Sequence, residues 1–167
     1  MFFDRIFNNG KPEKGMLLVA EPFMMDPNFR RTVVLLTEHD EKGTVGFVLN
    51  KTLDLQPRDA ISGFPAFDHD LILGGPVQKD NLFFIHRAGD RIPGSLEIAE
   101  GLYWGGDFEV VQELIKAGVL DPDNIRFFVG YSGWESGQLE KEMETNSWIL
   151  TPAKVSDVFD TPSEKLW

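Results

Sequence analysis

A serine in a glycine-rich segment is the first residue whose setting suggests chemistry. Ser132 lies in residues 130–140, GYSGWESGQLE, between an apolar run and a polar, helix-forming run at residues 138–144. A serine between glycines, at a predicted strand-to-helix turn, is similar to the nucleophile elbow of hydrolases. The elbow needs glycine two residues after the serine, and Trp134 stands there. Ser132 and Glu135 have the spacing of a capping box, so we predict that Ser132 caps the helix.

A catalytic serine also needs a base, and the histidines are His39, His69 and His86. His39 falls in a predicted hairpin turn, and His69 stands between two aspartates in a polar loop. His86 ends an apolar run and is the base that the sequence offers. A small serine hydrolase using Ser132 and His86 is therefore an alternative function, although an ordinary strand-end role is the more common one for such a histidine.

The composition argues against several kinds of site. The chain has no cysteine, and its histidines have no paired metal-ligand spacing, so we predict no metal site. The segment GGPV at residues 74–77 lacks the lysine and hydroxyl of a P-loop and the third glycine of a dinucleotide site, and we predict no cofactor. Four glutamates around the predicted helix start oppose a phosphate there and favour a neutral or cationic group: Glu135, Glu140, Glu142 and Glu144.

The charge of the chain is acidic and unevenly placed. The net charge is -11; residues 1–58 carry eight acids and eight bases, and residues 59–167 carry nineteen acids and eight bases. Because an anionic surface repels phosphate backbones, we expect no direct binding of nucleic acid. The N-terminal apolar stretch is interrupted by charges and is too short for a signal core or a membrane span. We therefore expect a cytoplasmic protein without membrane contact.

Hairpin signals dominate the chain, and helical patterns come late. The turn at residues 40–43 joins β-branched runs at residues 32–38 and 44–50. Further strands are predicted at residues 16–20, 71–73, 82–86, 96–98, 102–104, 125–129 and 148–150. Helices are predicted at residues 108–117, capped by Asp107, at 138–144, and after Pro152. This order predicts an α+β fold, with residues 1–14 as an N-terminal extension or short helix and residues 15–167 as a single domain.

Four segments together resemble one family of bacterial proteins. They are residues 15–26 (GMLLVAEPFMMD), 32–51 (TVVLLTEHDEKGTVGFVLNK), 74–86 (GGPVQKDNLFFIH) and 130–150. In motif order and spacing they are similar to the YqgE/AlgH family. The resemblance implies a mixed, mostly antiparallel sheet that is curled like a barrel and flanked by helices. It also implies a proposed role in transcriptional regulation, without an agreed biochemical activity.

These observations favour a non-enzymatic regulatory or binding protein that acts through contacts with a protein or small-molecule partner. The predicted groove combines polar and aromatic residues near glycines in the four segments: Asn50, Lys51, Gly75, His86, Tyr131, Ser132, Trp134 and Gln138. The hydrolase is the alternative. Direct control of transcription by DNA contact lacks a basic recognition helix, because residues 108–117 carry only Lys116. The sequence names neither the partner nor the oligomeric state.

Overall fold

Nine strands join into one sheet in the computed structural model, which describes residues 10–167. The order across the sheet is β6-β7-β5-β8-β3-β2-β1-β9, and β4 pairs with β8 beside this path. The pairing of β4 with β8 is parallel, and the other pairings between described strands are antiparallel. The strands are β1 Met16–Ala20, β2 Val33–Asp40, β3 Gly43–Val48, β4 Ile72–Leu73, β5 Val77–His86, β6 Leu96–Ala99, β7 Leu102–Trp104, β8 Ile125–Glu135 and β9 Trp148–Pro152.

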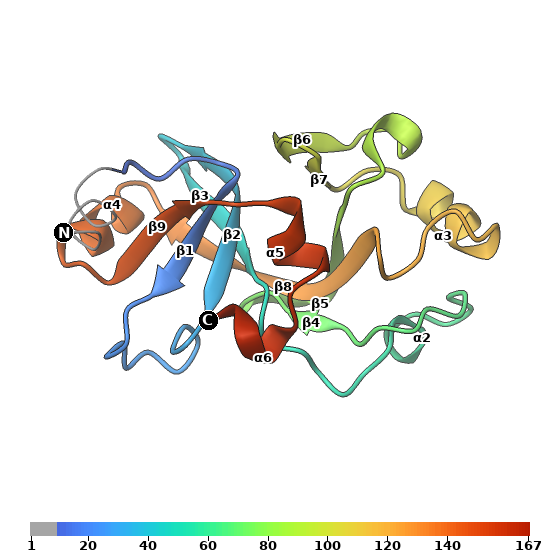
Figure 1. Cartoon of the computed structure of the whole chain (residues 1–167), viewed down its shortest axis with the longest axis horizontal. Coiled ribbons are helices and arrows are strands. Elements are labelled where there is room, and N and C mark those ends of the chain that lie inside the picture. Colours follow the sequence, from blue (N-terminus) through green and yellow to red (C-terminus); the bar gives the residue numbers. More distant parts are fainter. Residues whose placement is uncertain (1–9) are drawn as a thin grey trace.

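The sheet curls into a half-barrel, and β8 connects its two halves (Figure 1). The first part of β8 pairs with β5, from Ile125 opposite His86 onward. Its last part pairs with β3, from Ser132 opposite Gly46 to Glu135 opposite Gly43. One strand of 11 residues thus supplies side chains to two separate ends of the molecule.

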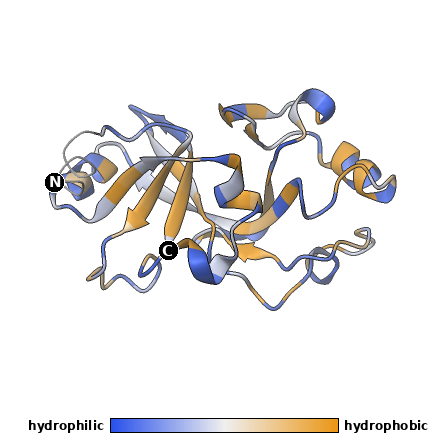
Figure 2. Ribbon diagram, in the orientation of Figure 1, coloured by the Kyte–Doolittle hydropathy of each residue, from blue (hydrophilic) through white to orange (hydrophobic). Residues whose placement is uncertain are grey.

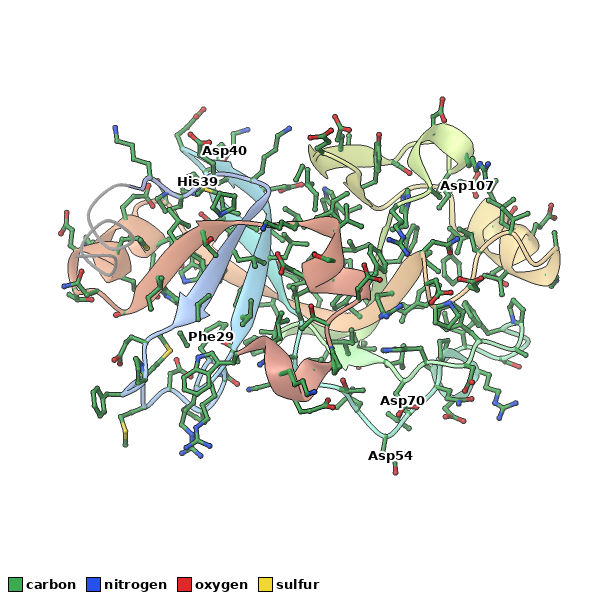
Figure 3. The ribbon with its side chains drawn as sticks, in the orientation of Figure 1. Phe29, His39, Asp40, Asp54, Asp70 and Asp107 are labelled. Carbon is green, nitrogen blue, oxygen red and sulfur yellow. The ribbon has the colours of Figure 1, made fainter. Side chains whose placement is uncertain are left out.

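Short helices lie at the ends and over one face of this sheet (Figure 1). Their bounds are α2 Pro57–Ala60, α3 Phe108–Lys116, α4 Gln138–Glu144, α5 Val155–Phe159 and α6 Ser163–Leu166, with a 3-10 turn at Gly89–Arg91. Helix α3 begins as predicted: the Asp107 side chain, labelled in Figure 3, accepts hydrogen bonds from the backbone N–H groups of Glu109 and Val110. The α+β fold of one domain is therefore confirmed, with strands dominating and helices on the periphery.

The core is divided among three clusters of buried apolar residues. One contains Phe47 and Phe128, and a second packs Phe127 against helix α3. The third lies under β1, β2 and α4 and contains Trp134 and Trp148. The apolar colour of β1, β2 and β9 in Figure 2 shows how strongly these strands contribute to the core.

The predicted N-terminal extension is only partly described. Residues 1–9 lie outside the described part of the chain, and residues 10–13 carry no helix or strand. The other main difference from prediction concerns β8, which was expected to end at residue 129 and instead continues to Glu135. That extension changes the interpretation of the whole glycine-rich segment.

Candidate functional site

An open groove of about 590 Å³ lies over the end of β8 in the described part of the chain. This volume is in the range of ordinary ligand sites. Its walls come from the end of β2, the start of β3, the start of β5 and residues 131–135 of β8. We call it the β8 groove. Its lining comprises Glu38, Asp40, Lys42, Gly43, Thr44, Val45, Val77, Tyr131, Gly133, Trp134 and Glu135.

Strand register explains how the β8 groove is assembled. Glu38 pairs with Val45, which pairs in turn with Gly133. In the next row on the same face, two residues further along each strand, Asp40 pairs with Gly43, which pairs with Glu135. Because alternate residues of a strand share a face, these two rows place their side chains on the same side of the sheet as Tyr131. Val77 pairs with Tyr131 and completes the wall on the β5 side.

Two glycines shape the floor of the β8 groove in different ways. A Cβ at Gly43 would lie 2.6 Å from the carbonyl oxygen of Trp134, and its φ of 143° also excludes most other residues. A Cβ at Gly133 would lie 3.3 Å from Cε2 of Tyr131 and would therefore project into the groove beside that ring. Gly43 therefore permits β3 to pack closely on β8, while the missing side chain at Gly133 leaves space in the groove beside Tyr131 and Val77.

The rim of the β8 groove is acidic. Glu38, Asp40 and Glu135 are exposed carboxylates, and Lys42 is the one basic residue in the lining, which gives the lining a formal charge of -2. His39 and Asp40 lie together near the end of β2 (Figure 3). Among the described residues, no three His, Cys, Asp or Glu side chains converge closely enough to hold a metal ion. The groove is therefore better suited to an organic cation or a basic side chain than to a coordinated metal.

A rigid aromatic cluster supports the groove from below. Trp134 and Trp148 are buried, and their rings contact each other and Phe29 at centroid distances of 5.5–6.1 Å. Both indole N–H groups donate to one oxygen of Glu142, at 3.2 Å from Trp134 and 2.9 Å from Trp148. Gln138 donates to the other oxygen of Glu142 at 3.1 Å and accepts from the Glu135 N–H at 2.9 Å. The tryptophans are core residues, and their polar atoms are satisfied.

Ser132 does not cap a helix. It is fully buried in β8, and its Oγ donates to the carbonyl oxygen of Gly74 at 2.9 Å. Helix α4 starts later, with Gly137 at its N-cap in a left-handed conformation. The capping-box prediction is wrong because antiparallel pairing of Ser132 with Gly46 extends the strand past the glycines. A single side-chain cap contributes less than the series of inter-strand hydrogen bonds that the extended strand forms.

His86 is a buried structural residue and lies far from Ser132. It pairs with Ile125, seven residues before Ser132 on β8, which is a separation of roughly 20 Å along an extended strand. Its Nδ1 accepts the Ala88 N–H at 3.1 Å, so the neutral ring carries its proton on Nε2 and donates to Ser95 Oγ at 2.9 Å. Burial lowers the pKa of His86 to about 4. The Ser132–His86 pair on which the hydrolase alternative depends is therefore not formed, and His86 cannot activate Ser95 through the nitrogen that faces it.

Asn50, Lys51 and Gly75 hold neighbouring loops in place. Asn50 accepts from the Val33 N–H at 3.0 Å and donates to the Arg31 carbonyl at 2.9 Å. The Lys51 ammonium donates to two main-chain carbonyls of residues 27–28, and burial lowers its pKa against the opposing charge of Asp26. A Cβ at Gly75 would lie 2.2 Å from the backbone of Tyr131, so this glycine permits close packing on β8. Lys51 and Gly75 line a hollow of only about 30 Å³.

The eight predicted site residues thus do not form one groove. Tyr131 and Trp134 line the β8 groove, while Trp134 and Gln138 line a neighbouring depression of about 200 Å³. The predicted groove did not include the acidic residues Glu38, Asp40 and Glu135, although Glu135 was among the glutamates expected to favour a cationic group. The sequence pattern around Glu135 could have indicated its position. Outward-facing Tyr131, Gly133 and Glu135 alternate with buried Ser132 and Trp134, and this period of two residues predicts a strand.

Comparison with known proteins confirms the resemblance noted in the sequence. The family model described as DUF179, AlgH-like, matches residues 17–167. The chain belongs to this family. A UPF0301 protein of Chlorobaculum tepidum is 46% identical over 153 residues, covering 92% of this chain and 82% of the relative. A UPF0301 protein of Cytophaga hutchinsonii is 45% identical over 155 residues, covering 92% and 85%.

Two solved structures of similar proteins share the fold. The solution structure of the AlgH protein from Pseudomonas aeruginosa has a TM-score of 0.75 and 34% identity, covering 94% of this chain and 87% of that one. A crystal structure from Corynebacterium diphtheriae has a TM-score of 0.77 and 30% identity, covering 95% and 87%. Within the described part of this AlgH-like chain, no helix is both long and apolar enough to cross a membrane.

Proposed function

We propose that this AlgH-like protein is a non-enzymatic binding protein that recognises a basic segment of a partner protein in the β8 groove. The observation that supports it most is the combination of three exposed carboxylates with a floor hollowed at Gly133. An extended segment can approach the strand backbone there, and a Lys or Arg side chain can reach the carboxylates on the rim.

The partner chemistry follows from the two kinds of surface in the groove. Tyr131 and Val77 form a partly apolar wall, which suits the aliphatic stem of a basic side chain or a neighbouring apolar residue. The acidic rim supplies charge complementarity, which speeds encounter and excludes acidic partners. Because exposed ion pairs are screened by salt, the affinity should fall as ionic strength rises.

A regulatory role through protein contact is the finer part of the proposal. The net charge of -11 favours contact with a basic protein over contact with DNA. A hydrolase is not proposed, because Ser132 and His86 are each engaged in structural hydrogen bonds at separate places on the sheet.

A peptide-display screen on the immobilised protein tests the proposal. The recovered peptides should carry Lys or Arg beside an apolar residue. Their affinity should fall about tenfold in the double variant Glu38→Gln/Glu135→Gln, which corresponds to about 1.4 kcal/mol. Gly133→Leu should abolish binding, because the added side chain projects into the groove beside Tyr131.

The matched control is Glu109→Gln/Glu113→Gln on helix α3. It changes the net charge by the same amount at exposed positions outside the groove lining. Its peptide affinity should stay close to that of the wild type. Equal losses in both double variants would assign the effect to net charge. Unchanged binding by Gly133→Leu would remove the β8 groove as the site.

A further inference from the structure

A second cavity, of about 220 Å³, lies at the opposite end of β8 from the β8 groove. It is enclosed by Arg126 of β8, by the loop that contains His69, and by α5, α6 and the residues between them. Figure 1 shows these two C-terminal helices lying over the middle of the sheet, and Asp70, next to His69, is labelled in Figure 3. We call this cavity the arginine pocket.

Arg126 is a half-buried cation that forms no ion pair with a carboxylate of the described residues. Its Nη2 donates to the Phe159 carbonyl at 3.2 Å, and the guanidinium lies over the Phe159 ring at 5.4 Å from the centroid. Burial lowers the pKa of Arg126, and the charges of Asp123 and, more weakly, Asp160 act in the opposite direction. An arginine has five N–H donors, and a carboxylate can accept two of them in parallel.

His69 supplies an acceptor in the same cavity. Its Nδ1 lies 2.7 Å from the carbonyl oxygen of Asp70, which places the proton of the neutral ring on Nδ1 and leaves the lone pair on Nε2. Burial and the charge of Arg126 lower the pKa of His69, so the ring is neutral at pH 7. A neutral acceptor beside a cation suits a ligand that carries both a negative group and a hydrogen-bond donor.

Two aspartates in the lining limit the charge of that ligand. Asp157 and Asp160 line the arginine pocket together with Arg126. With neutral His69, the formal charge of the lining is -1, so a dianionic phosphate would meet net repulsion. Asp160 is close enough to influence the pKa of Arg126 but does not form an ion pair with it. The negative and the positive group of a ligand can therefore each contact a residue of opposite charge.

We propose that the arginine pocket binds a free α-amino acid, with the carboxylate on Arg126 and the ammonium group directed to His69 and the acidic side of the pocket. A zwitterion matches the cation, the neutral acceptor and the carboxylates of the lining simultaneously. The volume of about 220 Å³ suits a small molecule of this class and is below that of a typical drug-sized site. This site is separate from the β8 groove and does not depend on the function proposed for it.

Titration of the ¹⁵N-labelled protein by NMR tests the assignment, with L-alanine and L-serine as probes. Both should shift the Arg126 Nε–Hε signal and the backbone amide signals of residues 159–161 and Ser163 in a saturable way. Acetate and ethylammonium, each carrying half of the zwitterion, should bind at least about tenfold more weakly. Acetate binding as tightly as alanine would overturn the amino-acid assignment, as would tighter binding of inorganic phosphate.

Two variants and one control complete the test. Arg126→Gln should weaken alanine binding at least about tenfold. Arg87→Gln should not, because Arg87 lies over the same Phe159 ring, at 5.1 Å, but does not line the cavity. Ser163→Leu keeps Arg126 and adds an apolar side chain to the lining, so it should abolish binding even if Arg126→Gln fails to fold. Unchanged shifts in Ser163→Leu, or no saturable shift in the wild type, would overturn the proposal.

Discussion

The two ends of strand β8 differ in how their polar groups are satisfied. At the β8 groove, Glu142 accepts both indole N–H groups beneath the floor, and the acidic side chains lie exposed on the rim. At the arginine pocket, Arg126 is half-buried without a carboxylate partner among the described residues. The first end is a packed support that presents carboxylates to solvent, and the second end holds a half-buried cation that contacts a main-chain carbonyl and an aromatic ring.

This difference predicts different responses to mutation. A satisfied, close-packed cluster stabilises the fold, so its truncation should lower the free energy of unfolding. A half-buried cation without an ion pair contributes little to folding, because the cost of its burial offsets the gain from its other contacts, so its replacement should mainly change binding. Stability measurements on variants at the two ends of β8 therefore distinguish residues that stabilise the fold from residues that bind a ligand.

Trp148→Ala should have the largest effect. Trp148 is fully buried, contacts Phe29 and Trp134, and donates to Glu142. Its truncation should lower the free energy of unfolding by about 3–5 kcal/mol in urea denaturation. Trp167→Ala is the control, because Trp167 is 45% exposed and should cost much less. A loss below about 1 kcal/mol for Trp148→Ala would show that the cluster does not support the groove as described.

The pH dependence of stability should report on His86, which lies on the arginine side of β8. Burial lowers its pKa from 6.5 to about 4 in the folded protein. Between these values the unfolded chain binds a proton that the native ring excludes, so stability falls as pH decreases from 6.5 towards 4. At pH 5 this contribution amounts to about 2 kcal/mol relative to pH 7.

Comparison with His86→Gln isolates that contribution. The variant should lose less stability than the wild type between pH 7 and pH 5, in urea denaturation at the two pH values. The wild-type ring should remain neutral at pH 5 in NMR spectra. A ring that titrates near pH 6.5 would contradict the burial argument, and equal pH dependence in both proteins would assign the effect to other groups.

Ser132 gives a smaller effect that distinguishes the strand from a helix cap. Ser132→Ala removes the hydrogen bond to the Gly74 carbonyl, which keeps the Val48 N–H as a donor, and should therefore cost only about 0.5–1.5 kcal/mol. Ser132→Asp should cost more, since it buries a carboxylate in β8. An N-cap would give the opposite order, with Asp close to wild type. Urea denaturation of both variants distinguishes the strand position of Ser132 from an N-cap.

Local signals predicted much of this fold. The turn at residues 40–43 correctly predicted the hairpin of β2 and β3, and Asp107 correctly predicted the start of α3. These features depend on neighbours in the chain, such as a glycine turn or a capping side chain. The family resemblance supplied the curled sheet that local patterns alone did not.

The site was less predictable because it depends on long-range pairing. Gly130 has a φ of 71°, so its segment resembles a turn, yet β8 continues through it because β3 pairs with the residues beyond. Glu38 and Glu135 meet at one groove although 97 positions separate them in the sequence. Arg126 is the polar residue of the strand predicted at residues 125–129, and its cavity exists only because residues 155–166 fold over it.

Arg126→Met should have the smallest effect on stability and therefore tests the comparison most directly. It removes the bond to the Phe159 carbonyl and the contact with the Phe159 ring, but it also removes the cost of keeping a cation half-buried. Because these terms oppose each other, the free energy of unfolding should stay within about 1 kcal/mol of the wild type in urea denaturation. Arg87→Met is the control at an exposed position over the same ring. A loss of several kcal/mol confined to Arg126→Met would mean that the guanidinium holds the C-terminal helices in place, and the two ends of β8 would then both be structural supports.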